Sequence, residues 1–195
     1  KNDMSKFVES IDQSLPMITR NLTRSKQIID NFKRMATDQM QFSAEQLSLS
    51  SYYERLLLTL TPLFKRKKVA LVFNGCENDQ IMTFPGCHAQ LLTNLITNSV
   101  QHGFVDHSAD NVISVNIHKD EQHNFIVDYI DNGRGIPTEL MEKVLEPFFT
   151  TARQQGNSGL GLAIVYNLVH QNLGGTFEVL KSDTGAHFRY QFKSA

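Results

Sequence analysis

The chain has 195 residues, of which 41% are hydrophobic and 20% are charged, and its formal net charge is -1. This composition is typical of a soluble globular protein long enough to bury a core, and the near-neutral charge argues against nucleic acid as a partner. Cys76 and Cys87 lack metal-binding or redox spacing, so we expect unpaired thiols. No stretch is apolar for long enough to span a bilayer, and we expect a cytoplasmic fragment whose parent protein could still be membrane-anchored.

Residues 5–40 are predicted to form one long helix with a single apolar seam. The apolar positions recur in alternating steps of three and four residues, at Leu15, Ile18, Leu22, Ile29, Phe32 and Ala36. Pro16 predicts a kink or a fresh helix start early in this segment. A seam of this kind needs a partner helix to cover it.

The rest of the chain alternates between strand and helix patterns. Short strands are expected at 47–49 and 81–82, and longer strands at 69–73, 112–118, 125–130, 176–180 and 186–192. Helices are expected at 52–65, capped by Ser50 or Ser51, at 87–102, and from Gly159 to the glycine pair 174–175. The pattern predicts an α/β protein built as a two-layer α/β sandwich, with one mixed sheet and helices on one face.

The segment 131–137 reads DNGRGIP and follows an apolar strand. A carboxylate held at Asp131 can accept a hydrogen bond from the exocyclic amine of adenine, and the wrong base would leave a buried acceptor unpaired. Gly133 and Gly135 allow close backbone approach to a ligand. The alternative is a plain Asp-Asn-Gly turn, which is a common structure.

Asn94 and Asn98 are four residues apart on a predicted helix, so they project from the same side. A side-chain amide oxygen is a hard, neutral ligand that suits Mg²⁺ shared with phosphates and water. The alternative is polar spacing on an exposed helix face.

A phosphate-binding helix end is predicted further along the chain. Residues 148–151 read FFTT, and Gly159, Leu160, Gly161 and Leu162 open an apolar helix. Unsatisfied N–H groups at such a helix start favour polyphosphate. The polar run 154–158 suits a mobile lid, from which Arg153 could reach phosphate.

These motifs, in this order, resemble the ATP-binding domain of sensor histidine kinases over roughly residues 45–195. The resemblance implies a histidine-kinase-type ATPase fold at 42–195, preceded by a long helix at 1–41 that matches the second helix of a dimerisation hairpin. It implies ATP and Mg²⁺ as cofactors, with Asn98 holding the metal and Asn94 supporting it as the catalytic pair. The implied nucleotide contacts are Asn94, Asn98, His102, Asp131, Gly133, Gly135, Ile136, Thr150, Thr151, Arg153, Gly159, Leu160, Gly161 and Leu162.

The implied activity is transfer of the ATP γ-phosphoryl group to a histidine, followed by relay to the receiver domain of a response regulator. The parent protein would be a homodimer. None of the seven histidines stands in the setting of such an acceptor, so we expect the acceptor just before Lys1. The fragment alone should then bind ATP without phosphorylating itself.

Three positions bear on rival functions. Gln101 stands where the family often has a basic residue, and Ala186 stands where a threonine near adenine is common. These departures favour a degenerate nucleotide-binding regulatory or dimerisation module. An ATPase of the same superfamily is a second rival, but its relatives carry glutamate at the position of Asn94, and an amide cannot take a proton. A purely structural helical dimer is a third rival, for which the glycine motifs have no use.

Overall fold

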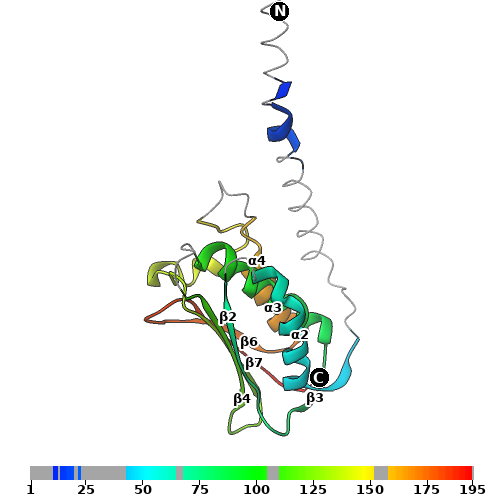
Figure 1. The fold of residues 1–195 in the computed structure, drawn as a ribbon. Helices are drawn as coiled ribbons and strands as arrows, with labels where there is room; N and C mark the ends of the chain where they lie inside the picture. The colour runs from blue at the N-terminus through cyan, green and yellow to red at the C-terminus, as the bar shows by residue number, and fades with distance from the viewer. Residues whose placement is uncertain are drawn as a thin grey trace, which may run out of the picture.

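The computed structural model describes residues 11–12, 14–19, 22, 43–64, 68–104, 110–151 and 158–194. Its central feature is a five-stranded mixed sheet with the strand order β2-β4-β5-β7-β6 (Figure 1). The strands are β2 (Ala70–Asn74), β4 (Val112–Lys119), β5 (Phe125–Asp131), β7 (His187–Phe192) and β6 (Thr176–Leu180). β2 runs parallel to β4, and the other pairs are antiparallel. The predicted mixed sheet is therefore confirmed.

Three helices cover one face of this sheet, as Figure 1 shows: α2 (Leu49–Phe64), α3 (Pro85–Asn98) and α4 (Gly161–Asn167). The two-layer sandwich expected from the sequence is confirmed. The core lies between the layers, where alternate residues of β4 (Ile113, Val115 and Ile117) face the buried sides of α3 and α4. This alternation is the period of a strand with one buried face.

Two helices end in π-helical turns. α3 continues into η2 (Ser99–Gly103), and α4 continues into η6 (Leu168–Asn172). Gly174 has φ +59°, and the Gly175 N–H donates to the Val169 carbonyl, which ends the second helix where the glycine pair predicted. Two short 3₁₀ turns, η3 (Thr138–Leu140) and η4 (Lys143–Leu145), lie between β5 and α4.

The short strands β1 (Glu45–Ser48) and β3 (Gln80–Thr83) pair with each other and form a separate two-stranded antiparallel sheet. The expectation of one sheet was therefore wrong. Both short strands were predicted, but periodicity within a strand does not say which strand it pairs with.

The start of α2 also differs from the prediction. α2 begins at Leu49, and the Ser51 N–H donates to the Ser48 hydroxyl at 3.2 Å, so Ser48 and not Ser50 or Ser51 is the cap. Asp79 provides further acceptors, because its carboxylate accepts from the Ser50 N–H and its carbonyl accepts from the Leu49 N–H. This long-range acid takes up helix-end donors that a local sequence pattern assigns to serines alone.

A chain of hydroxyl groups and one imidazole runs through the core. Tyr53 Oη lies 2.6 Å from Tyr190 Oη and 2.8 Å from His88 Nδ1, and His88 Nε2 lies 2.9 Å from Thr83 Oγ1. All four side chains are buried. Because each polar atom named here has a partner, the network ties α2, α3, β3 and β7 together without an unpaired buried group.

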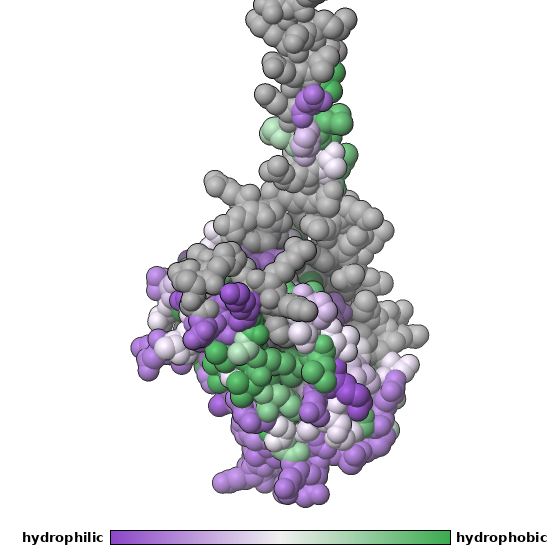
Figure 2. All heavy atoms as spheres, viewed as in Figure 1, coloured by the Kyte–Doolittle hydropathy of each residue, from purple (hydrophilic) through white to green (hydrophobic). Residues whose placement is uncertain are grey.

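The leading segment is described only in part. Residues 11–12, 14–19 and 22 are helical, and their apolar side chains are exposed: Ile11, Leu15, Met17, Ile18 and Leu22. These side chains include the green atoms on the extension at the top of Figure 2. The remainder of the helix expected at 5–40 lies outside the described residues, so the boundary near residue 41 stays a prediction.

Within the described ranges, no helix is both long and apolar enough to cross a membrane. Cys76 and Cys87 are both free thiols, as expected, and Cys87 is buried.

Candidate nucleotide-binding site

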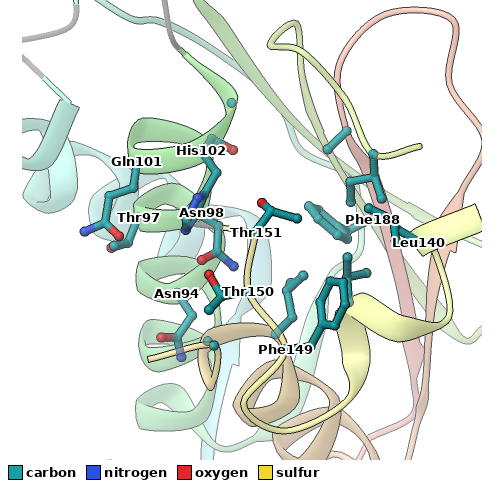
Figure 3. Close-up of a pocket in the computed structure, with 18 of the residues that line it drawn as sticks. Asn94, Thr97, Asn98, Gln101, His102, Leu140, Phe149, Thr150, Thr151 and Phe188 are labelled. Carbon is teal, nitrogen blue, oxygen red and sulfur yellow. The ribbon is translucent and has the colours of Figure 1, made fainter. Parts of the chain in front are cut away.

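A cavity of about 450 Å³ opens between α3, the end of β5 and the start of α4, a volume within the usual range for a small-molecule site. Figure 3 shows Asn94, Asn98 and His102 along one helical wall, with Phe149 and Phe188 on the opposite side. The cavity is lined by Asn94, Thr97, Asn98, Ser99, Gln101, His102, Gly103, Asp131, Arg134, Gly135, Ile136, Pro137, Leu140, Val144, Phe149, Thr150, Thr151, Ser158, Gly159, Gly161, Leu162, Ile164, Ala186 and Phe188.

Asp131 is the last residue of β5, and its side chain is fixed by three donors. Its Oδ1 accepts from the backbone N–H groups of Gly133 and Ala186, each at 3.0 Å. Its Oδ2 accepts from the hydroxyl of Ser99. The residue is only 3% exposed, yet it lines the cavity. The carboxylate is therefore a buried, oriented acceptor, which is the property needed to read a donor on a ligand.

The chain approaches Asp131 so closely that a glycine is needed at position 185. Gly185 has φ +68°, and a Cβ there would lie 1.7 Å from the Asp131 carbonyl oxygen. No L-side chain fits that space, and the left-handed conformation itself disfavours one. This contact brings the start of β7 over the end of β5, where the Ala186 N–H reaches the carboxylate.

Asn94 and Asn98 both line the cavity from α3, on the side that the four-residue spacing predicted. Asn98 lies against the start of α4, because a Cβ on Gly161 would be 3.1 Å from Asn98 Oδ1. The first residue of α4 therefore leaves room for this amide.

His102 and Arg134 stand near each other at the cavity wall. Burial lowers the pKa of His102, and the positive charge of Arg134 lowers it further. The imidazole is therefore neutral near pH 7. The Arg134 N–H donates to the Gly103 carbonyl at 3.1 Å, and its guanidinium Nη2 lies 3.5 Å from Thr151 Oγ1.

Most of the residues that the sequence selected as nucleotide contacts come together at this cavity. The lining includes Asn94, Asn98, His102, Asp131, Gly135, Ile136, Thr150, Thr151, Gly159, Gly161 and Leu162. Gly133 is outside the lining, but its N–H holds Asp131. Leu160 is fully buried in the core, and Arg153 lies outside the described residues, as does most of the expected lid. The roles assigned to these residues stay predictions.

Several lining residues were not selected from the sequence. Ser99 and Gly103 follow Asn98 on the same helical segment, and Arg134 lies inside the glycine motif, so motif order pointed near them without giving them a role. Leu140, Val144 and Phe188 read as ordinary apolar residues, and no signal in the sequence separates them from the core.

The comparison with protein families agrees with this site. Residues 88–195, more than half of the chain, match the family model described as "Histidine kinase-, DNA gyrase B-, and HSP90-like ATPase". The chain therefore belongs to this ATPase family. Together with the curated relatives, the match identifies residues 88–195 as the ATP-binding part of a histidine kinase catalytic domain.

Two curated relatives are kinases of this class. The chain is 33% identical to hybrid signal transduction histidine kinase A of Dictyostelium discoideum over 99 residues, which is 46% of this chain and 5% of that protein. It is 25% identical to sporulation kinase A of Bacillus subtilis over 198 aligned residues, which is 97% of this chain and 30% of that protein. The chain thus spans less than a third of either relative.

The fold is shared with a solved histidine kinase. The structure of ThkA in complex with the response regulator protein TrrA matches at a TM-score of 0.73 and 20% identity, over 96% of this chain and 52% of that one. At this identity the similarity establishes the fold.

Proposed function

We propose that this domain transfers the γ-phosphoryl group of ATP to a histidine supplied by a dimerisation hairpin, for relay to the receiver domain of a response regulator. The observation that carries the proposal is the buried Asp131 carboxylate at the cavity wall, held by Ser99, Gly133 and Ala186. The match to the histidine-kinase class of ATPase and the likeness to the ThkA complex support the same reaction and partner.

Asp131 reads the adenine base in this proposal. An ionised carboxylate is an acceptor only, so it pairs with the exocyclic amine of adenine and repels the carbonyl that guanine presents there. Because the site is buried, a mismatched base leaves the carboxylate without its ligand partner, which costs more than the same loss in water. The apolar surface against which the adenine ring would pack is provided by Ile136, Ile164 and Phe188.

Asn98 and Asn94 are the proposed metal side of the site. The donor set fits Mg²⁺, because amide oxygens are hard ligands and the lining brings two such side chains to one wall. Mg²⁺, when bound, would neutralise charge on the transferred phosphate. Asn98 would hold the ion through its side-chain oxygen, and Asn94 would support it from one turn away.

The amide of Asn94, at the position where hydrolytic relatives carry glutamate, favours transfer over hydrolysis. Among the described residues that line the cavity, Asp131 is the only Asp or Glu, and it is engaged at the proposed adenine end. Asn94, on the helical wall, cannot accept a proton from water. A positioned histidine nitrogen needs no such base to attack, so catalysis rests on orientation and charge neutralisation.

A second candidate function is nucleotide-dependent regulation without transfer. It is favoured by Gln101, an uncharged side chain in the wall. Incubation of this chain with radiolabelled ATP and an added hairpin peptide that carries a histidine separates the two. Acid-labile, alkali-stable phosphohistidine supports the kinase, and bound nucleotide without phosphohistidine supports the regulatory module.

The nucleotide site itself is tested by titration calorimetry with ATP and Mg²⁺. Asp131→Asn should weaken ATP binding by more than about 1 kcal/mol, because the amide presents a donor toward the adenine amine and breaks the local hydrogen bonds. Asp183→Asn, the same change in an exposed turn, is the matched control. Equal affinity of Asp131→Asn and the unmodified chain would overturn the site.

A further inference from the structure

The nucleotide site has an uneven charge distribution. A nucleoside triphosphate carries several negative charges, and Mg²⁺ neutralises only part of them. Among the described residues that line the cavity, Arg134 is the only Lys or Arg. Two other polar lining residues do not supply a cation. Gln101 has no charge, and His102 is neutral near pH 7 because burial and the Arg134 charge both lower its pKa.

The backbone of Arg134 is fixed, whereas its guanidinium is free to meet a ligand. The Arg134 N–H donates to the Gly103 carbonyl at 3.1 Å, and the neighbouring Gly133 N–H donates to Asp131. These bonds anchor the 131–137 loop, which carries Arg134, to the end of η2. The residue is exposed, and no carboxylate of the described residues forms a salt bridge with it. Its positive charge is therefore available.

The direction of the Arg134 side chain is set by its one contact. Guanidinium Nη2 lies 3.5 Å from the hydroxyl of Thr151, which also lines the cavity. The side chain thus reaches from the Asp131 loop toward the FFTT segment, along the cavity wall. A guanidinium in this place presents several N–H donors, which match the oxygens of a phosphate two at a time.

We propose that Arg134 is a phosphate-binding cation of this pocket, and that it acts from the 131–137 loop. The inference rests on the proposed nucleotide site and adds to it a residue that selects for the phosphate chain. Asp131 then determines affinity for the base, whereas Arg134 determines how much affinity each added phosphate contributes. The contact with Thr151 holds the guanidinium at the cavity wall. Phosphate oxygens replace this weak contact when the nucleotide binds.

The test is a calorimetric series with adenosine, AMP, ADP and ATP on the full chain. Arg134→Gln should weaken ATP binding roughly tenfold at low ionic strength and leave adenosine binding unchanged, because the lost interaction is a charge-assisted hydrogen bond to phosphate. The ATP deficit should shrink as salt is raised, since the guanidinium is exposed. Arg134→Lys keeps the charge but loses the paired donors, so its ATP affinity should lie between those of Arg134→Gln and the unmodified chain.

Three further variants make the result decisive. Lys143→Gln removes an exposed cation in η4 that does not line the cavity, and it should bind ATP as the unmodified chain does. Gln101→Lys in the Arg134→Gln background places a cation elsewhere in the cavity lining and should restore part of the ATP affinity. Arg153→Gln should add to the loss in Arg134→Gln if both cations contact phosphate.

The outcomes separate this inference from the site on which it rests. Equal losses for adenosine and ATP in Arg134→Gln, or no loss for either, would overturn the role of Arg134, while the Asp131→Asn result would still stand. A deficit found only in Arg153→Gln would assign the phosphate contact to that residue and also overturn the inference. Failure of the unmodified chain to bind any of the four ligands would instead overturn the proposed nucleotide site.

Discussion

The hydroxyl of Ser99 donates to the Asp131 carboxylate, and it lies 2.9 Å from the hydroxyl of Tyr129. All three side chains are buried, so a line of polar groups runs from β5 through η2 back to the end of β5. Burial raises the pKa of Tyr129, and the nearby Asp131 raises it further although the hydrogen bond with Ser99 opposes this, so the phenol stays protonated. Tyr129 can then donate to Ser99, which leaves the Ser99 proton for Asp131.

This relationship predicts that Ser99 supports nucleotide binding without touching the metal. Ser99→Ala should weaken ATP binding by about 1 kcal/mol, the usual net value of one hydrogen bond, because Asp131 loses one of the three donors that orient it. The dependence of binding on Mg²⁺ should be unchanged. Calorimetry with and without Mg²⁺ measures both effects.

Ser114→Ala is the matched control for this change. Ser114 lies in β4, the strand next to the β5 strand of Asp131, and does not line the cavity. An unchanged ATP dissociation constant in Ser99→Ala would mean that the two backbone donors alone fix the carboxylate.

The contact between Gly161 and Asn98 leads to a second prediction. A Cβ at position 161 would lie 3.1 Å from Asn98 Oδ1, which is tighter than most Cβ contacts and requires the amide to shift slightly. Gly161→Ala should therefore displace the amide and weaken the Mg²⁺-dependent part of ATP binding several-fold. Stability should stay level or rise by up to about 1 kcal/mol, because alanine is the better helix former.

This test separates a local effect from misfolding, because binding should weaken while stability does not fall. Urea unfolding measures the stability, and calorimetry at several Mg²⁺ concentrations measures the binding. Loss of stability together with loss of binding would point to a general packing fault. Full Mg²⁺-dependent affinity in the variant would show that the metal sits away from Asn98.

The sequence predicted the layers of this fold well, because periodicity reports directly which face of an element is buried. The alternating strand of 112–118 and the apolar helix face from Leu91 to Val100 both appear as expected. Pairing between distant strands left no such trace, which is why the β1–β3 sheet was missed. The role of Asp79 at the start of α2 was missed for the same reason, because this acceptor is 29 residues away in sequence from Ser50.

For the site, motif spacing located residues whose type is chemically distinctive, such as Asp131, Asn94 and Asn98. It gave no role to Ser99 or Arg134, since serine and arginine are common on helices and in loops. Their roles depend on surroundings that only the fold supplies: the Asp131 carboxylate for Ser99, and for Arg134 a described cavity lining with no other Lys or Arg.

The close approach of Gly185 to Asp131 predicts a large loss of stability on substitution. Gly185→Ala would combine an unfavourable left-handed backbone with a Cβ placed 1.7 Å from a carbonyl oxygen. We expect a loss well above the roughly 1–2 kcal/mol of the backbone effect alone. The free energy of unfolding from urea denaturation measures it.

Gly174→Ala separates the backbone effect from the steric clash of the Cβ. Gly174 also has a positive φ, +59°, but a Cβ there meets nothing within 4 Å. This variant should lose only the backbone part. Similar losses in both variants would mean that the start of β7 shifts readily away from Asp131.

Burial of His88 predicts a specific dependence of stability on pH. Burial lowers the pKa of its imidazole from 6.5 to about 3, since Tyr53 and Thr83 surround it with neutral hydroxyls. Between these two pH values the unfolded chain binds a proton at this position and the folded chain does not. Stability therefore falls as the pH falls from 6.5 toward 3, by up to about 1.4 kcal/mol per pH unit from this one group.

Replacement by an amide should remove this contribution. His88→Gln will be less stable than the unmodified chain near pH 7, because the core network is disturbed, but the difference between the two should narrow as the pH is lowered from 6.5 to 4. Urea unfolding across this range measures the difference, which cancels the carboxylates common to both proteins. The same substitution at the exposed His123 is the control, because it leaves the buried imidazole in place. A constant difference between His88→Gln and the unmodified chain would mean that His88 takes up its proton in the folded state, so that the core near Tyr53 admits charge.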